Sequence, residues 1–210
     1  MLAHALRPIG LAPPGTTDPV DQHPEAGGTA LLDARPLVLV TGIPAAGKST
    51  VAQGLARRFE RGVHVRGDVF RRMVVAGRHE MTAAPTEEAR RQLRLRYRLG
   101  AATADAYHRA GFAVVVQDVV IGPALADYVD MLRSRPLVVV VLAPRPEVVA
   151  AREAARAKDA YEGPDHLAAL DAALRSGTPG IGLWLDTSEL SPEATVDAIA
   201  ARGLAEGGVA

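Results

Sequence analysis

The stretch Thr41-Gly-Ile-Pro-Ala-Ala-Gly-Lys-Ser-Thr50 decides the fold class of this chain. Residues 42–49 match the pattern G-x-x-x-x-G-K-[ST] at every fixed position. In a chain of this length and composition, the number of such matches expected by chance is on the order of 10⁻³. Gly42 and Gly47 permit backbone angles and close approaches that a Cβ would block. Successive backbone N–H groups can then point into one concavity and bind phosphate oxygens. The stretch therefore predicts a phosphate-binding loop.

The side chains of this motif have separate expected roles. Lys48 should reach the β- and γ-phosphates of a nucleotide, and the Ser49 hydroxyl should ligate Mg²⁺. The helix expected to begin at Lys48 adds its positive N-terminal end. ATP and Mg²⁺ are therefore the predicted cofactors, with GTP as the alternative nucleotide. The predicted nucleotide-binding residues of the loop are Gly42, Ile43, Pro44, Ala45, Ala46, Gly47, Lys48, Ser49 and Thr50.

Short apolar runs alternate with helical segments on both sides of the loop. Residues 37–41, just before it, are rich in β-branched side chains, as a buried parallel strand should be. Such alternation predicts βαβ units with right-handed crossovers. The expected fold is an α/β P-loop sandwich of three layers, nucleoside-kinase-like, in which helices cover both faces of a five-stranded parallel sheet. Strands are expected at 37–41, 63–66, 112–118, 137–142 and from 183, and helices at 48–59, 68–76, 86–110, 123–133, 147–157, 165–175 and from 191.

The length and composition suit one domain with an extension. The chain has 210 residues, of which 48% are apolar, so it can bury a core without disulfides. Proline and glycine recur through residues 1–35 without a helical or strand period, which predicts a flexible or loosely docked N-terminal extension. This extension either has no function or caps the active site. Residues 36–210 would form the P-loop domain, with a small lid near 152–166.

Several classes of protein are disfavoured. The formal net charge of zero argues against a general nucleic-acid binder. The absence of cysteine excludes disulfides and thiolate metal sites. No apolar run approaches the roughly 20 residues of a membrane span, and no secretory signal is recognisable. We therefore expect a cytoplasmic monomer or homodimer that acts on a small molecule.

Two carboxylates follow predicted strands, where ligands of open parallel sheets bind. Asp118 resembles a Walker B acid that would hold a Mg²⁺-bound water or orient the acceptor. Asp68 is the candidate general base for an acceptor hydroxyl. The simpler alternatives are a loop carboxylate for Asp118 and a helix cap for Asp68.

Arginines near these positions are candidates for binding negative charge. Arg152 and Arg156 are four residues apart, so they share one helix face and could neutralise the γ-phosphoryl group or stack on adenine. The alternative is a solvated helix with Glu153 as local partner. Arg71 and Arg72 flank the expected acceptor pocket and are predicted to bind substrate. The arginines of the long helix are expected to be mostly surface charge, although one or two could reach an anionic acceptor; they are Arg90, Arg91, Arg94, Arg96 and Arg98.

These features together resemble the chloramphenicol phosphotransferase-like family of small P-loop kinases, with gluconate and shikimate kinases as more distant relatives. The resemblance covers about residues 37–204. Besides the P-loop, it rests on the segments Gly67-Asp68-Val-Phe-Arg-Arg-Met73, Val116-Gln-Asp-Val-Val-Ile-Gly122, Ala151-Arg-Glu-Ala-Ala-Arg156 and Asp186-Thr-Ser188.

The resemblance implies ATP-dependent phosphorylation of a hydroxyl group. It implies Asp68 as base, Arg152 or Arg156 as lid arginines, and Asp186 and Thr187 in an adenine-side loop. Asp118 corresponds to the second acid of a paired acidic dipeptide in which Gln117 replaces the first. The acceptor does not carry over, because residues 71–98 match the family weakly.

The sequence thus predicts a phosphotransferase that moves the γ-phosphate of Mg-ATP to a hydroxyl of an antibiotic or a sugar-like metabolite. Lys48, Asp68, Arg152 and Arg156 are the predicted catalytic residues. The alternatives are an ATPase or GTPase switch, a regulatory nucleotide-binding module, and a nucleotide or nucleic-acid kinase. The chain contains no asparagine, so it lacks the N-K-x-D motif with which common GTPases bind guanine.

Overall fold

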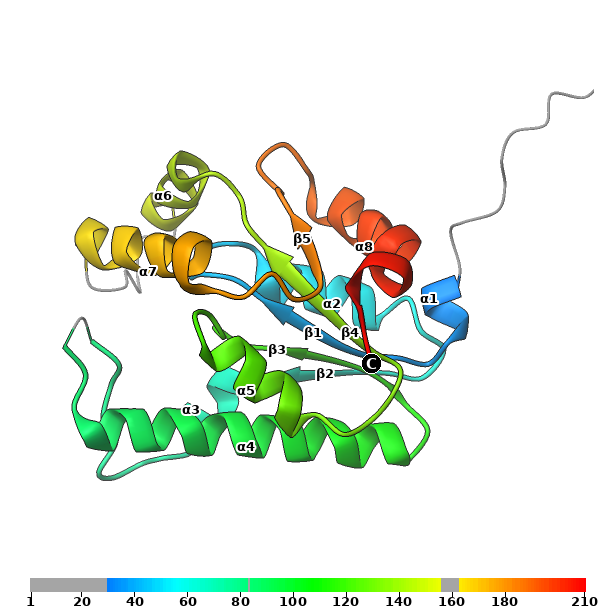
Figure 1. The fold of residues 1–210 in the computed structure, drawn as a ribbon, viewed down its shortest axis with the longest axis horizontal. Coiled ribbons are helices and arrows are strands. Elements are labelled where there is room, and N and C mark those ends of the chain that lie inside the picture. The colour runs from blue at the N-terminus through cyan, green and yellow to red at the C-terminus, as the bar shows by residue number, and fades with distance from the viewer. Residues whose placement is uncertain (1–29, 83, 156–162) are drawn as a thin grey trace, which may run out of the picture.

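A computed structural model of the chain describes residues 30–82, 84–155 and 163–210, and Figure 1 shows its fold. The sheet contains five parallel strands in the order β2 (Gly62–Arg66), β3 (Ala113–Gln117), β1 (Leu37–Thr41), β4 (Leu137–Leu142) and β5 (Leu183–Leu185). The predicted five-stranded parallel sheet is therefore confirmed. A sixth strand that the sequence analysis missed, β6 (Gly208–Val209), pairs antiparallel with β4.

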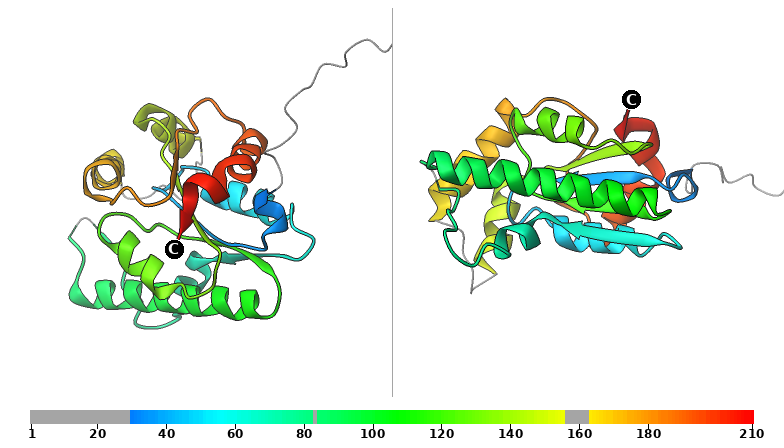
Figure 2. Two further views of the ribbon diagram at one scale, coloured as in Figure 1. Left: turned by 45° about the vertical axis from the view of Figure 1, so that its right-hand side comes forward. Right: turned by 90° about the horizontal axis from the view of Figure 1, so that it is seen from below.

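Helices cover both faces of the sheet, as predicted (Figures 1 and 2). α4 packs against α5 on one side, and α2 packs against α8 on the other. The described helices are α1 (Ala30–Asp33), α2 (Lys48–Ala56), α3 (Gly67–Arg72), α4 (Glu87–Arg109), α5 (Ala124–Met131), α6 (Pro146–Ala154), α7 (Gly163–Gly177) and α8 (Pro192–Gly207).

Local chemistry accounts for the ends of two long helices. The Thr86 hydroxyl accepts a hydrogen bond from Ala89 N (3.1 Å) and caps α4. Ser191 caps α8 in the same way, with Pro192 at the first helical position, as the sequence predicts.

The helix predicted at 68–76 is shorter than expected. α3 ends at Arg72, and residues 73–82 and 84–86 form a loop, called the 73–86 loop below. The β-branched pair Val74 and Val75 lowers helix propensity, and Gly77 adopts a positive φ of 69° that ends any continuation. The loop leaves room beside α4 for the pocket described below.

The last residues of the predicted N-terminal extension, 30–35, are part of the described structure. Leu31 in α1 is fully buried, and a Cβ on Gly203 of α8 would lie 3.2 Å from its side chain. Residues 30–33, which the sequence analysis placed in the extension, therefore form a helix packed against the domain. Residues 1–29, 83 and 156–162 lie outside the described residues, and with them Arg156 and part of the predicted lid near 152–166.

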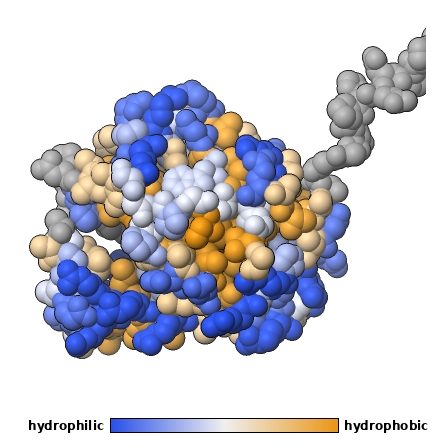
Figure 3. All heavy atoms as spheres, viewed as in Figure 1, coloured by the Kyte–Doolittle hydropathy of each residue, from blue (hydrophilic) through white to orange (hydrophobic). Residues whose placement is uncertain are grey.

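Figure 3 shows one face of the molecule, where apolar side chains gather near the middle and hydrophilic side chains form the lower rim along α4. Among the described helices, none is both long enough and apolar enough to cross a membrane.

The central strands form the core of the sheet. Every residue of β1, β3 and β4 is buried. Thr41, the last residue of β1, lies beside the segment that follows β3. Its hydroxyl donates to Val120 O (2.7 Å) and accepts from Val120 N (2.9 Å), and Thr41 is completely buried. This pair of hydrogen bonds joins the residue before the P-loop to the segment that contains Asp118.

We expect Thr41→Val to lower the free energy of unfolding by about 3 kcal/mol, because it leaves two buried backbone groups without partners. Threonine and valine have similar shapes, so the hydroxyl is the main difference between them. Urea unfolding of the purified variant measures the change. Thr41→Ser is the control, since it retains the hydroxyl and should cost only about 1 kcal/mol for the lost methyl group. Equal stability of the valine and serine variants would contradict this account.

Candidate active site

The loop between β1 and α2 has the backbone geometry that its two glycines predict. Gly42 has φ 142°, and a Cβ there would lie 2.5 Å from Leu142 O in β4. Gly47 has φ 93° and forms the N-cap of α2. Ala45 also has a positive φ, 59°, which is uncommon outside glycine and typical of functional loops. The chain therefore turns tightly enough to expose successive N–H groups.

Lys48 lies within this loop rather than in solvent. Lys48 is only 8% exposed, and its Nζ atom donates a hydrogen bond to Ile43 O at 2.7 Å. The N–H of Ala46 donates to the same carbonyl at 3.3 Å. Ser49 is half-buried in the first turn of α2. The ammonium group is thus positioned at the concave side of the P-loop, where a phosphate chain would bind.

The register of the sheet brings the candidate carboxylates to the same edge as the P-loop. Gln117 of β3 pairs with Val40 of β1 on one side and with Arg66 of β2 on the other. The residues that follow β1, β2 and β3 therefore lie at the same edge of the sheet. Gly67 packs directly on Asp118, since a Cβ on Gly67 would lie 1.9 Å from its Oδ2 atom. Asp68, which follows Gly67, therefore lies close to Asp118 at this edge of the sheet.

Asp118 is buried and already surrounded by donors. It is 2% exposed, and the Arg96 guanidinium contacts both of its carboxylate oxygens, with Nε 2.7 Å from Oδ2. The backbone N–H of Val119 donates to Oδ1 at 2.7 Å. Its contacts are those of a structural ion pair, so a role as a direct Mg²⁺ ligand remains a prediction.

Arg96 is the site residue that sequence reasoning missed. Its side chain is only 15% exposed, whereas the long helix was expected to carry mostly surface arginines. A signal was present, because Arg96 falls at the spacing of the buried positions of α4. The buried positions include Ala89, Tyr97, Gly100, Ala104 and His108, and the partly buried Leu93 has the same spacing. The other arginines of this helix are exposed, including Arg90, which shares that spacing; they are Arg90, Arg91, Arg94, Arg98 and Arg109.

Asp68 lies in an arginine-rich environment at the start of α3. Arg71 Nε donates to its Oδ1 at 2.9 Å, and Arg72 Nη2 lies 3.0 Å from Oδ2. Partial burial raises the pKa of Asp68, but the Arg71 hydrogen bond and the charges of Arg71, Arg72 and Arg96 outweigh it, so the pKa falls below its ordinary value. Asp68 is therefore an ionised hydrogen-bond acceptor at neutral pH.

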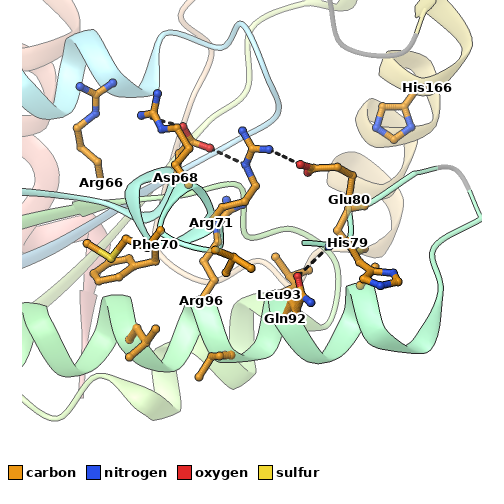
Figure 4. A pocket seen from close by; sticks show the side chains of 17 residues that line it. Arg66, Asp68, Phe70, Arg71, His79, Glu80, Gln92, Leu93, Arg96 and His166 are labelled. Atoms are coloured by element: carbon orange, nitrogen blue, oxygen red, sulfur yellow. Dashed lines mark hydrogen bonds and ion pairs between the residues drawn. The ribbon is translucent and has the colours of Figure 1, made fainter. Parts of the chain in front are cut away.

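Asp68 faces a pocket of about 920 Å³ between α3, the 73–86 loop and α4, with one wall from α7. Figure 4 shows Arg71 between Asp68 and Glu80, and His166 on the opposite side. Arg71 Nη1 donates to Glu80 Oε1 at 2.7 Å, which connects α3 to the loop. The polar lining residues are Arg66, Asp68, Arg71, Arg72, His79, Glu80, Gln92, Arg96 and His166.

A single glutamine fastens the 73–86 loop to α4. Gln92 Oε1 accepts from His79 N (2.9 Å), while its Nε2 donates to Gly77 O (2.8 Å). The side-chain amide thus satisfies both a donor and an acceptor of the loop backbone. This contact gives the outer wall of the pocket a defined position.

The predicted adenine-side loop follows β5. Arg152 Nη2 donates to Thr187 O at 3.1 Å, so this predicted lid arginine contacts the loop backbone. Asp186 accepts hydrogen bonds from the hydroxyl and backbone N–H of Ser188, and these bonds lower its pKa. Arg145 N donates to Ser188 Oγ at 2.8 Å. Arg152, Asp186 and Thr187 are therefore grouped together, apart from the Asp68 pocket lining.

In the part of the chain that the structure describes, no three His, Asp or Glu side chains form a cluster suited to a metal ion.

Comparison with solved structures identifies proteins of the same fold. A sugar kinase from Janibacter sp. HTCC2649 is 24% identical over 79% of this chain and 93% of that chain, with a TM-score of 0.59. A gluconokinase from Sinorhizobium meliloti 1021 is 19% identical over 81% and 92%, with a TM-score of 0.55. The Mycobacterium tuberculosis APS kinase, in complex with AMPPNP and APS, is 16% identical over 79% and 95%, with a TM-score of 0.55.

At these identities the likeness shows a shared fold, and it confirms at that level the resemblance to P-loop small-molecule kinases. No curated protein sequence matches the chain. Residues 37–179, more than half of the chain, match a family described as the AAA domain, and this segment runs from β1 through the P-loop and the Asp68 pocket into α7. The chain belongs to this AAA domain family.

Proposed function

We propose that this protein is an ATP-dependent phosphotransferase that moves the γ-phosphate of Mg-ATP to a hydroxyl group of a small molecule. The observation that carries the proposal is the common edge of the sheet, where the P-loop follows β1 and the Asp68 pocket follows β2. A nucleotide site and a separate pocket at one edge are what transfer between two bound molecules requires. The kinase names of the structural neighbours support the same activity.

Each group at this edge has a proposed role. The P-loop N–H groups and Lys48 would bind the phosphates, and Lys48 would exchange its contact with Ile43 O for phosphate oxygens. Asp68 would accept the proton of the acceptor hydroxyl. The new bond forms between the acceptor oxygen and the γ-phosphorus as the bond from that phosphorus to the β,γ-bridging oxygen breaks, leaving ADP. Such transfer depends mainly on alignment and charge neutralisation.

The low pKa of Asp68 makes it a weak base, but it fits this reaction. In a loose phosphoryl-transfer transition state the acceptor proton is lost late, so alignment by an ionised carboxylate matters more than basicity. Arg71 and Arg72 keep Asp68 ionised and restrict its orientation. Asp68 would therefore both orient the hydroxyl and take its proton.

The remaining predicted residues complete the proposal. Ser49 would ligate Mg²⁺, and Asp118 would contribute through a bound water or by fixing Arg96 at the pocket. Arg152, Asp186 and Thr187 would contact the nucleotide on its adenine side, with Arg152 and Arg156 available to the transferred group when the nucleotide is bound. The acceptor would be an antibiotic or a sugar-like metabolite.

The first test measures ADP release from Mg-ATP across hydroxylated antibiotics, sugars and nucleosides. We expect one acceptor class to raise turnover above the basal rate. Lys48→Ala should lower the stimulated rate at least about 100-fold, because it removes a donor to the developing charge. Asp68→Asn should lower it about 100-fold, because it removes the proton acceptor.

Asp130→Asn is the matched control for Asp68→Asn, since Asp130 is an exposed aspartate of α5 outside the pocket. It should leave the stimulated rate unchanged. ATP binding without stimulation by any acceptor, together with no effect of Asp68→Asn, would instead favour an ATPase switch or a regulatory nucleotide-binding module.

The pH dependence of turnover provides a second test. Because the pKa of Asp68 is lowered, kcat/KM should stay high until the pH falls below the ordinary aspartate range. Arg71→Gln removes a hydrogen bond and a charge that stabilise the carboxylate, so the pKa of Asp68 should rise and the acid limb should move to higher pH. The pH profile of kcat/KM under saturating Mg-ATP measures this shift.

Arg72→Gln should shift the same limb less, because the hydrogen bond from Arg71 is the stronger of the stabilising contacts. If the acid limb of the Arg71→Gln variant coincides with that of the unmodified protein, Asp68 is not the titrating group.

A further inference from the structure

The pocket beside Asp68 carries an excess of positive charge. Four arginines line it against two carboxylates, namely Arg66, Arg71, Arg72 and Arg96 against Asp68 and Glu80. The whole chain has 24 basic and 24 acidic residues, so its formal net charge is zero. The excess is therefore a property of this pocket and not of the composition.

Part of this charge is balanced within a chain of ion pairs. Arg72 and Arg71 both contact Asp68, Arg71 also contacts Glu80, and Glu80 contacts Arg78 at 2.9 Å. These ion pairs involve three arginines, Arg71, Arg72 and Arg78, and two carboxylates, Asp68 and Glu80. The five side chains form a charged row that borders the pocket and has a net charge of one positive unit.

The two other arginines of the pocket differ in their surroundings. The charge of Arg96 is balanced by the buried carboxylate of Asp118. Arg66 lines the pocket at the end of β2, and among the described residues its side chain has no hydrogen-bond or ion-pair partner. In Figure 4 the side chains of Arg66 and Asp68 extend to the same side of the ribbon. The pocket therefore has two positive charges more than its own acids balance.

Resting on the proposed function, we propose that the acceptor carries a carboxylate or phosphate group in addition to its reactive hydroxyl, and that Arg66, Arg71 and Arg72 bind this anionic group. Guanidinium groups bind carboxylate and phosphate oxygens through paired, planar N–H donors. Binding an anion here balances the excess charge and leaves Asp68 to contact the hydroxyl. The volume of about 920 Å³ accommodates a small metabolite together with its anionic group.

The carbon skeleton of such an acceptor also finds a suitable surface. Phe70 and Leu93 line the same pocket and are partly buried against the core. They provide apolar contact area between the charged row and α4. The pocket thus combines charged and apolar walls, as small-molecule sites commonly do.

The test compares acceptors that differ only in the anionic group. Suitable pairs are D-gluconate with D-glucitol, glycerol 3-phosphate with glycerol, and adenosine 5′-monophosphate with adenosine. We expect the charged member of at least one pair to stimulate ADP release with a KM at least about tenfold below that of its neutral partner. Its KM should rise between 50 and 300 mM salt, whereas the KM of the neutral partner should not, because salt screens charge interactions.

Arg66→Gln identifies the residue responsible, since Arg66 is exposed and its replacement disturbs no described contact. It should raise the KM for the charged acceptor about tenfold and leave the KM for ATP unchanged. Arg109→Gln, at an exposed position on the far end of α4, is the matched control and should change neither value. An increase in the KM for ATP alone would assign Arg66 to the nucleotide and overturn the proposal.

Calorimetric titration of the same compounds into the protein with Mg-ADP measures their binding independently of turnover. Binding and stimulated ADP release, taken together, separate the anionic-acceptor proposal from the phosphotransferase proposal. Stimulation by neutral members as strong as by charged ones would retain the phosphotransferase and overturn the anionic acceptor. Without stimulation by any compound, tighter binding of a charged member, lost in Arg66→Gln, would retain the anion site and count against phosphotransfer. Failure of every charged member to bind more tightly than its partner would overturn the anion site.

Discussion

Pairing of β1 with β3 on one side and β4 on the other is the constraint on which the site depends. Because every residue of these strands is buried, a shift of register by one residue would exchange the side chains on the two faces of the sheet and disrupt their packing against the helices. The carboxyl ends of the three strands are therefore aligned at one edge of the sheet, and the loops that follow them begin side by side. The close approach of Gly42 to Leu142 O, and the paired hydrogen bonds between Thr41 and Val120, both require this alignment. Phosphate binding and acceptor binding thus share one rigid base.

Electrostatic contacts then refine what the sheet positions. Asp118 and Arg96 form a buried pair, and the loss of either partner would leave an uncompensated charge. Asp68, by contrast, is partly exposed and belongs to a row of ion pairs that reaches the 73–86 loop through Arg71 and Glu80. One carboxylate is therefore fixed within the framework, while the other faces the pocket. Two strand-end acids that look equivalent in sequence thus have different surroundings, which explains why we assign them different roles.

The sequence predicts most of the framework because its signals are local. The P-loop motif, the apolar runs of the five parallel strands and the cap at Ser191 all depend on neighbouring residues. The features that it did not predict depend on distant contacts. Burial of Arg96 requires a partner 22 positions away, and burial of Leu31 requires α8. β6 has only two residues and forms by pairing with Leu137 and Val138 at the start of β4. The early end of α3 is a local feature, because Val74 and Val75 lower helix propensity and Gly77 has a positive φ.

The contact between Gly67 and Asp118 has an evolutionary consequence. Any side chain at position 67 would occupy the space of the Asp118 carboxylate, and that carboxylate in turn neutralises Arg96. Positions 67, 96 and 118 are therefore not free to vary one at a time. Among homologous sequences we expect them to covary, so that a larger residue at 67 accompanies a smaller one at 118 and an uncharged one at 96. Such a trio would mark lineages in which the pocket has changed its preference for charge.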